Sequence, residues 1–279
     1  MGANGSDRTD RVVLTTGSNS GIGLAVALEV ARLGFRSVGS VRSEAKARLV
    51  HRAAERAGVS VETVLLDVTD SGRCREVIDD LRPWGLVNNA GYGGMGAIED
   101  VGDEEARLLM ETMVMAPMRL SRLAAPHMRA GGGGRVINMS SVFGRTTAPL
   151  AGWYSGAKHA LEALSDAFRM EVASAGIKVV LVEPGGFRTG IWGEVGETAT
   201  IRAGSAYERA YRRSSTGLRL TEPLMGDPAR VAGVAGRALT SRFPSERYLV
   251  GLDAVALTLA RRYTPTGLRD RVARLGLGL

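Results

Sequence analysis

The sequence predicts one α/β domain in which helices cover both faces of a parallel sheet. Short β-branched runs alternate with longer amphipathic stretches through the first 185 residues, a pattern typical of right-handed βαβ units. The short runs are almost continuously apolar, as expected for strands buried on both faces. No internal repeat or linker interrupts the alternation, and 279 residues are enough for one large domain with a substantial core.

Strands and helices follow one another in a regular order before Pro184. The predicted strands are Arg11–Thr16, Arg36–Val41, Val61–Leu66, Leu86–Asn89, Arg135–Ser140 and Ile177–Glu183. The predicted helices, whose apolar residues recur at helical spacing, are Ile22–Leu33, Glu44–Ala57, Ser71–Leu81, Glu104–Met128 and Gly152–Ala175. The glycine run at 131–134 ends the fourth helix, and Pro184-Gly185 stops the last strand.

The pattern changes after Pro184, so we divide the chain into a core at 11–190, a substrate flap at 191–226 and terminal helices at 227–279. Gly190–Thr221 mixes Gly, Ser, Tyr and Arg without strong periodicity, which predicts a mobile helical flap. Asp227-Pro228 is a good N-cap and first-turn pair for a helix that runs to Ser241. An edge strand is expected at Tyr248–Val250, and two short helices are expected at Ala254–Arg262 and Gly267–Leu275.

The charge of the chain is basic and unevenly distributed. There are 36 basic and 29 acidic residues, which gives a net charge of +7, and only three of the basic residues are lysines. Residues 201–279 hold 14 arginines against 6 acids, whereas residues 1–200 hold 22 basic residues against 23 acids. This distribution argues against a nucleic-acid-binding body. The arginine excess is also consistent with a GC-rich bacterial genome.

Several protein classes are excluded by composition. The single cysteine, Cys74, cannot form an internal disulfide and fits a reducing cytoplasm, where we expect the protein to reside. Three scattered histidines do not have the spacing of a zinc site, so we expect no metal. The polar start lacks the apolar region of a signal peptide, and no window approaches the ~20 apolar residues of a transmembrane helix.

A glycine-rich turn follows the first predicted strand. It reads Thr16-Gly17-Ser18-Asn19-Ser20-Gly21-Ile22-Gly23, with the spacing Gly-x-x-x-Gly-x-Gly. Glycines there let the backbone come close to a pyrophosphate, and the N-terminus of the next helix supplies free N–H groups. A tight turn without a ligand would look similar. Its position between a strand and an Ala-rich helix favours a nucleotide site.

The end of the second strand indicates which nucleotide binds. An acidic residue at this position would bind a ribose diol, but here Arg42 follows Val41 directly. A guanidinium group is a good partner for a 2′-phosphate, so the sequence favours NADP(H) over NAD(H), although a solvated surface arginine is the plain alternative. Asp67 and Val68 end the third strand, where they would contact an adenine edge; Asp67 would equally suit the cap of the next helix.

Tyr154 and Lys158 are the one Tyr-x-x-x-Lys pair in the chain. At i and i+4 their side chains share a helix face. An ammonium group there can stabilise tyrosinate and lower the pKa of the tyrosine, which would make Tyr154 a general acid/base near neutral pH. Ser140 and Ser141 end the fifth strand, and a hydroxyl at that sheet edge can polarise a carbonyl oxygen.

With these elements in order, the chain resembles the short-chain dehydrogenase/reductase family over residues 11–190. The matching segments are Thr16–Gly23, Asn88-Asn89-Ala90-Gly91, Ser141, Tyr154 with Lys158, and Pro184-Gly185 followed by Thr189. The resemblance implies a doubly wound, seven-stranded Rossmann sheet. It also implies that Ser141 positions the substrate oxygen, Tyr154 passes the proton, and Lys158 binds the nicotinamide ribose. Asn89 would shape the cofactor floor, and Thr189 would touch the nicotinamide carboxamide or the pyrophosphate.

One position departs from the family pattern. The family carries an asparagine in the helix Glu104–Met128, where it anchors a water of the proton relay, but this chain has Met113. A thioether is only a weak acceptor. Pro117 also removes a helix N–H and is expected to kink this helix. The proton path would then run differently, or turnover would be slower, or the chemistry would not be ordinary ketone reduction.

Family members choose their substrates mainly after the Pro-Gly motif. An apolar or aromatic wall over the nicotinamide is expected from Phe187, Ile191, Trp192, Tyr207, Tyr211 and Leu218, with additions from Tyr92, Phe143 and Trp153. The alternative is that half of them simply pack the flap. The segment Arg247–Gly251 with the helix after it is similar to bacterial relatives of 17β-hydroxysteroid and retinol dehydrogenases, which implies a bulky hydrophobic alcohol or ketone.

The sequence thus predicts an NADP(H)-dependent oxidoreductase, a ketoreductase in type, that interconverts a hydroxyl and a carbonyl on a hydrophobic small molecule. Two alternatives stay open because of Met113: a cofactor-binding protein with little turnover, and an isomerase, dehydratase or cyclase of the same fold. The family's long paired helices favour a homodimer or homotetramer. The arginines after residue 201 are a solvated face, or they contact an anionic substrate, a carrier or an acidic membrane surface.

Overall fold

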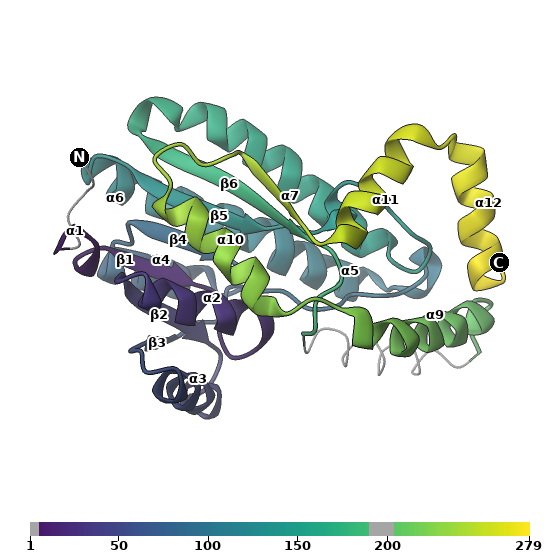
Figure 1. The fold of residues 1–279 in the computed structure, drawn as a ribbon, viewed down its shortest axis with the longest axis horizontal. Helices are drawn as coiled ribbons and strands as arrows, with labels where there is room; N and C mark the ends of the chain where they lie inside the picture. The colour runs from purple at the N-terminus through teal and green to yellow at the C-terminus, as the bar shows by residue number, and fades with distance from the viewer. Residues whose placement is uncertain (1–5, 190–203) are drawn as a thin grey trace.

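A computed structural model describes residues 6–189 and 204–279. At its centre lies a seven-stranded sheet in the order β3-β2-β1-β4-β5-β6-β7, and every neighbouring pair is parallel (Figure 1). The strands are β1 (Val12–Thr15), β2 (Arg36–Val41), β3 (Glu62–Leu65), β4 (Gly85–Asn88), β5 (Gly134–Met139), β6 (Ile177–Pro184) and β7 (Arg247–Val250). The predicted seven-stranded, doubly wound parallel sheet is confirmed.

The order of the strands positions the site. The chain moves outward from β1 to β2 and β3, and then returns to place β4 on the other side of β1. In open α/β sheets, ligands bind beyond the carboxyl ends of the strands at such a reversal. The segments that follow β1 and β4 meet there, because the backbone N–H of Thr16 donates to the carbonyl of Val87 at 2.9 Å.

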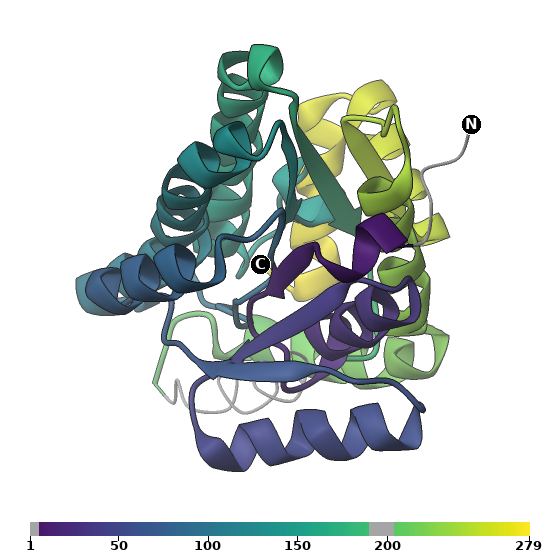
Figure 2. The same cartoon turned by 90° about the vertical axis from the view of Figure 1, so that its left-hand side faces the viewer.

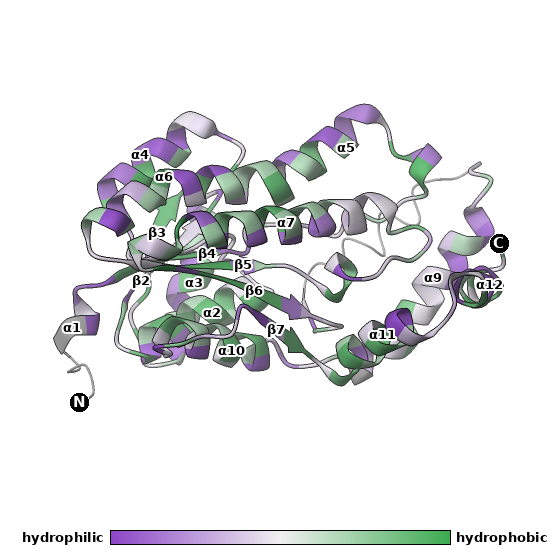
Figure 3. Ribbon diagram, turned by 90° about the horizontal axis from the view of Figure 1, so that it is seen from above, coloured by the Kyte–Doolittle hydropathy of each residue, from purple (hydrophilic) through white to green (hydrophobic). Residues whose placement is uncertain are grey.

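Helices cover both faces of the sheet (Figures 2 and 3). One face packs against α2 (Gly21–Arg32), α3 (Glu44–Arg56) and α10 (Pro228–Thr240). The other face packs against α4 (Ser71–Leu81), α6 (Ala116–Ala130) and α7 (Gly152–Glu171). Because both faces are covered, the strands are buried apolar runs, as in Val12–Thr15, rather than alternating ones.

The long helix predicted from Glu104 to Met128 is interrupted. It consists of α5 (Asp103–Met110), a π-helical turn η2 (Glu111–Met115) and α6. Pro117 has no N–H to donate to the carbonyl of Met113, so one α-helical hydrogen bond is missing at the junction of η2 and α6. The irregularity expected near Pro117 is therefore present as the π turn η2. Such π turns are frequent at functional sites.

The described C-terminal part also contains β7, α9, α11 and α12. The edge strand predicted at Tyr248–Val250 is present as β7 and pairs in parallel with β6. The flap predicted for 191–226 begins outside the described residues; its described part contains α9 (Glu208–Thr221). The two expected short helices are α11 (Leu252–Tyr263) and α12 (Thr266–Leu277). Among the described helices, none combines the length and apolarity needed to cross a bilayer.

Short helical turns complete the chain. They are α1 (Ser6–Thr9), η1 (Ile98–Asp100), η3 (Val142–Gly144), η4 (Ala173–Ala175) and η5 (Glu222–Leu224). Two of them bear on the site. Ser141 caps η3 by accepting a hydrogen bond from the N–H of Phe143 at 3.2 Å, and η5 leads into Gly226, which pairs with Phe187.

Candidate active site

The glycine turn borders a cavity of about 380 Å³ at the sheet reversal. Gly17 and Gly21 have positive φ angles of 67° and 54°, which side chains rarely adopt. A Cβ on Gly23 would lie 2.2 Å from the carbonyl oxygen of Gly17. Ser20, the N-cap of α2, makes no side-chain capping bond. The turn therefore presents bare backbone and free N–H groups at a helix N-terminus, as an anion site requires.

Asn89 holds this turn in place. Its Nδ2 donates to the carbonyls of Thr16 at 3.0 Å and Gly17 at 3.2 Å. The hydroxyl of Thr16 accepts in return from the backbone N–H groups of Asn89 and Ala90, both at 2.9 Å. The two strand ends thus form one cross-linked floor. Asn89, Ala90 and Gly91 all line the cavity, as expected from the sequence.

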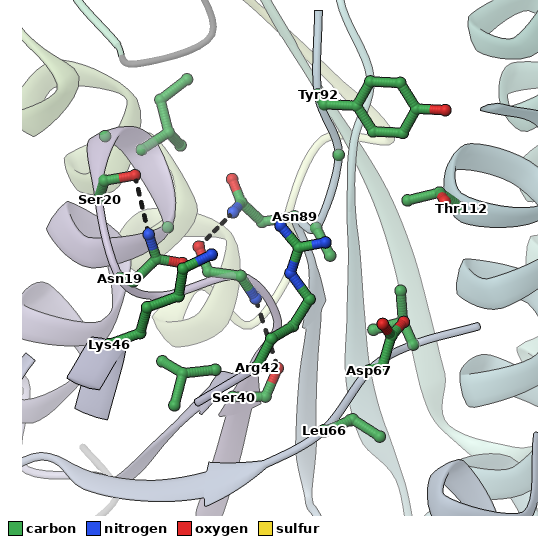
Figure 4. Close-up of a pocket in the computed structure, with 18 of the residues that line it drawn as sticks. Asn19, Ser20, Ser40, Arg42, Lys46, Leu66, Asp67, Asn89, Tyr92 and Thr112 are labelled. Atoms are coloured by element: carbon green, nitrogen blue, oxygen red, sulfur yellow. Dashed lines mark hydrogen bonds between the residues drawn. The ribbon is translucent and has the colours of Figure 1, made fainter. Parts of the chain in front are cut away.

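Arg42 reaches into the same cavity from the end of β2, and Lys46 joins it from the first turn of α3 (Figure 4). Lys46 is a lining residue that was not predicted from the sequence, although its position about one turn after the end of β2 was a usable signal. Asp67 and Val68 line the opposite side. The Asp67 carboxylate accepts from both the N–H and the hydroxyl of Thr69, at 3.0 and 2.7 Å, which lowers its pKa below the usual range. The cap of α4 is Asp70, not Asp67.

A second cavity of about 560 Å³ continues from the first, and both are lined by Ile22, Asn89, Gly91, Tyr92 and Thr189. Ser141, Tyr154 and Lys158 lie together on its wall. A hydrogen bond joins Tyr154 to Ser141, and the Phe143 ring meets the Tyr154 ring edge-on at 6.0 Å. Ser141, which lies between β5 and η3, is therefore brought next to Tyr154 and Lys158 of α7.

The electrostatics of this trio differ from the sequence expectation. Lys158 donates its ammonium hydrogen to the carbonyl of Met139 at 2.8 Å, and its Nζ lies 5.7 Å from the centre of the Tyr154 ring. Burial raises the pKa of Tyr154, and the hydrogen bond with Ser141 acts in the opposite direction. Burial also lowers the pKa of Lys158 to about 8. Within the protein alone, burial therefore changes the pKa of Tyr154 more than the Lys158 ammonium group does.

Met113 lies in the π-helical turn η2. Its side chain is buried in the second cavity's wall, in a cluster with Leu109, Val114 and Ala157 that Tyr154 also contacts. A Cβ on Gly91 would be 3.4 Å from its methyl carbon. Residue 113 therefore lies in the cluster against which Tyr154 packs, and its side chain there is a thioether.

A buried group of charges extends from Lys158 away from the cavity. Glu162, one turn along α7, faces Arg247 of β7 at 3.1 Å, and the same guanidinium lies 3.4 Å from the fully buried Glu183. Arg145 pairs with Glu183 at 2.5 Å. Burial raises the pKa of Glu183 despite this partner. The negative charge of Glu162 partly opposes the lowering of the Lys158 pKa.

Some of the residues predicted to form a substrate wall line this second cavity. Tyr92, Phe143, Phe187 and Leu218 line it, and Phe187 also packs into the core. Tyr207 and Tyr211 instead pack against Ala97 and Leu150, away from this wall. Trp153 belongs to the cluster around Met113. Ile191 and Trp192 lie outside the described residues. The wall also includes side chains that the sequence did not single out: Met95, Met139, Met225, Arg230, Leu252, Asp253 and Leu257.

Pro184 and Gly185 also border this cavity. A Cβ on Gly185 would lie 2.2 Å from a carboxylate oxygen of Asp253, and the N–H of Gly186 donates to that carboxylate at 2.5 Å. The Pro-Gly turn therefore remains bare because the start of α11 is packed on it.

The two cavities suit a nicotinamide dinucleotide. Gly23 lets the start of α2 pack directly on Gly17 and Asn89, and the N-terminus of that helix favours a diphosphate. Arg42 and Lys46 add positive charge at the far end, whereas Tyr154 and Lys158 lie at the other. A long ligand with a central anionic group fits this arrangement.

Comparison with known proteins agrees with the geometry. A family model described as short chain dehydrogenase matches residues 11–200. The chain is 33% identical to the uncharacterized oxidoreductase YusZ of Bacillus subtilis, over 90% of this chain and 92% of that protein. It is 31% identical to retinol dehydrogenase 5 of Homo sapiens (93% and 86%) and 30% identical to the NADPH-dependent 3-dehydrocapnine reductase of Ornithobacterium rhinotracheale (94% and 95%).

Solved structures share the fold. A short-chain dehydrogenase from Streptomyces avermitilis superposes with a TM-score of 0.76 at 32% identity, covering 95% of each chain. A metagenomic short-chain oxidoreductase in complex with NADP has a TM-score of 0.69 at 26% identity, covering 87% of this chain and 97% of that one. Fold and site thus define a nucleotide-dependent oxidoreductase of the Rossmann type. The chain belongs to the short-chain dehydrogenase/reductase family.

Proposed function

We propose that the protein is an NADP(H)-dependent dehydrogenase/reductase that interconverts a hydroxyl and a carbonyl on a hydrophobic small molecule. The observation that carries this proposal is the contact of Ser141 and Tyr154 on the wall of an apolar cavity that is continuous with the glycine-turn cavity. The bound dinucleotide would supply or accept the hydride. Everything else in the reaction is assigned to side chains of this chain.

Ser141 and Tyr154 would hold the substrate oxygen between their hydroxyl groups, and Tyr154 would exchange the proton with it. Lys158, cationic below about pH 8, would hold a ribose hydroxyl and favour loss of the tyrosine proton. The half-buried Tyr92 and Phe143 with the methionines around them would exclude water from the reacting centre. This environment strengthens every electrostatic contact inside it.

Two lines support a hydrophobic substrate. The second cavity is lined mostly by apolar side chains, among them Phe143, Met225 and Leu257. Retinol dehydrogenase 5, one of the relatives, is named for a lipid-like alcohol. The preference for the phosphorylated cofactor is supported by Arg42 and Lys46 and by the name of the NADPH-dependent relative.

A cofactor-binding protein with little redox turnover is the second candidate, because Met113 presents a weak acceptor beside Tyr154. One experiment separates the two. The protein is titrated with NADPH and NADH, and the reduced nicotinamide absorbance is then followed with steroid, retinoid and polyketide-like carbonyls. Oxidation with at least one of them supports the reductase, whereas tight NADPH binding with no oxidation would support the second candidate.

Cofactor preference is tested at Arg42. We expect Arg42→Gln to weaken NADPH binding by about tenfold to a hundredfold, the range of a lost charge-assisted hydrogen bond, and to leave NADH binding nearly unchanged. Arg48→Gln is the matched control, because Arg48 is an exposed arginine of α3 that does not line the cavity. Isothermal titration with both cofactors measures the effect. Equal losses for NADPH and NADH would contradict the assignment.

A further inference from the structure

Helices α11 and α12 form a C-terminal arm that extends beyond β7 at the edge of the molecule (Figure 1). The two helices are joined through Thr264-Pro265, and the C-terminal end of α12 meets α9 (Figure 1). The arm contacts the body of the protein at both ends: Asp253 accepts from the N–H of Gly186 and Ala254 is fully buried beside β7, whereas Leu277 packs against the cluster of Tyr207 and Tyr211. The rest of the arm is largely at the surface.

Each helix of the arm carries an apolar stripe that is exposed in the described part of the chain. On α11, Leu252, Val255, Leu259 and Tyr263 follow at i, i+3, i+7 and i+11, and they are 86, 40, 49 and 72% exposed. On α12 the stripe contains Leu268, Val272 and Leu275, which are 54, 62 and 67% exposed. Residues at such spacing share one helix face. The two stripes lie opposite the anchored sides, and none of the described residues covers them.

The charge around the stripes is strongly positive. The arm contains five arginines against two aspartates, and the neighbouring α9 contains four arginines against one glutamate. The arginines of the arm are Arg261, Arg262, Arg269, Arg271 and Arg274. In a symmetric pair of chains the same patch would meet itself, so these like charges would oppose one another. An acidic surface that also accepts apolar side chains is the complementary partner.

The arm is continuous with the apolar cavity. Leu252 and Leu257 of α11 line that cavity and are 86 and 44% exposed, so the cavity wall reaches the surface at the α11 stripe. Leu218 and Thr221 of α9 form the facing part of the wall. Any surface that covers the stripes would therefore also lie beside the entrance to the cavity.

We propose that the C-terminal arm docks the protein on the surface of an anionic lipid bilayer, with α11 and α12 lying in the interface. The stripes would enter the boundary between headgroups and acyl chains, and the arginines would contact lipid phosphates. That orientation would let an apolar substrate pass from the bilayer to the cavity. This last consequence rests on the proposed function, whereas the docking itself does not.

The test measures binding of the full chain to vesicles by flotation, without any substrate. Vesicles of equal parts phosphatidylcholine and phosphatidylglycerol are compared with vesicles of phosphatidylcholine alone. We expect binding to the anionic vesicles that weakens with salt. The charge variant Arg261→Gln, Arg262→Gln, Arg271→Gln, Arg274→Gln should lose at least about a hundredfold in partitioning. The apolar variant Leu259→Ser, Val272→Ser, Leu275→Ser should lose binding as well.

The matched control removes the same charge from the body of the protein. Arg48→Gln, Arg52→Gln, Arg56→Gln and Arg75→Gln change four exposed arginines of α3 and α4, and binding should be retained. Circular dichroism and NADPH binding confirm that each variant is folded. Absence of binding by the natural sequence, or an equal loss in the control, would overturn the proposal. So would a change of oligomeric state in the apolar variant without vesicle binding, which would make the arm an interface between copies. An arm that binds an acidic carrier protein but not vesicles would also refute it.

Discussion

Lys158 is a buried ammonium group on which two opposing influences act. Burial lowers its pKa to about 8, and the negative charge of Glu162, one helical turn away, raises it. Glu162 in turn has Arg247 as its partner at 3.1 Å. The charge state of the lysine at physiological pH therefore depends on a carboxylate that does not line either cavity.

This dependence gives a prediction for Glu162→Gln. Removing the negative charge leaves burial as the main influence, so we expect the pKa of Lys158 to fall below about 8 and the ammonium to be lost at a lower pH. Labelling lysine side chains with ¹³C makes this measurable by NMR, because the chain has only three lysines. Lys158→Arg identifies the signal.

Asp166→Asn is the matched control for that titration. Asp166 lies one further turn along α7 and shares Arg247 with Glu162, at 2.5 Å, but it does not act on Lys158. We expect a much smaller shift from it. Equal shifts in both variants would show that Arg247, rather than the Glu162 charge, sets the titration. In a functional enzyme, Glu162→Gln should also move the alkaline limb of the pH profile downward.

At this scale the sequence predicts short-range partners well and long-range partners poorly. Tyr154 and Lys158 share a helix face, so their spacing alone places them together. Glu162 and Arg247 are 85 positions apart, and the strand β7 that carries Arg247 joins α7 only in the folded sheet. Lys46 was not predicted as a site residue because surface lysines are common, and only the folded cavity shows that it lies beside Arg42.

The π turn η2 is the element in which this chain departs most from a regular helix. It places Met113 in a cluster with Leu109 and Ala157 against which Tyr154 packs, and Pro117 removes an α-helical hydrogen bond next to it. The sequence predicted an irregularity near Pro117 but not its form. A π turn depends on which carbonyl finds a donor, and that is decided by packing against α7 rather than by local propensity.

Met113→Asn tests what this element contributes. We expect the amide to provide the acceptor that a thioether lacks and to raise kcat with a carbonyl substrate, while KM changes little. Met113→Leu keeps the volume without adding an acceptor, so its kcat should stay near that of the natural sequence. Both are measured with the same substrate and with thermal unfolding. A rate that is unchanged in Met113→Asn would show that another group already serves the relay.

Across the whole molecule, hydrophobic patterning predicts the parallel sheet, because strands buried on both faces are recognisable as apolar runs such as Ile177–Glu183. The order of the strands comes from the structure. The position of the arginine-rich C-terminal helices could not be predicted from the sequence. Their apolar residues have helical spacing, but the spacing does not show what they contact. The structure shows that Leu252 and Leu257 line the cavity, whereas Leu268 and Val272 are exposed. The excess positive charge and the proposed catalytic residues therefore occupy different parts of the molecule.

That separation predicts how the protein responds to removal of α12. Deletion of residues 264–279 leaves both cavities intact, because none of the deleted residues lines them, so NADPH affinity should be preserved.

The same deletion removes the contact of Leu277 with Tyr207 and Tyr211 and the contact of α12 with α9. Local stability in a fold of this kind is set by such local packing. We therefore expect faster hydrogen exchange in α9 and unchanged exchange in β1, β4 and α2, measured by mass spectrometry with and without NADPH. Loss of NADPH binding in the truncated chain would show that the arm supports the body, whereas slow exchange in α9 would show that its stability comes from contacts other than α12.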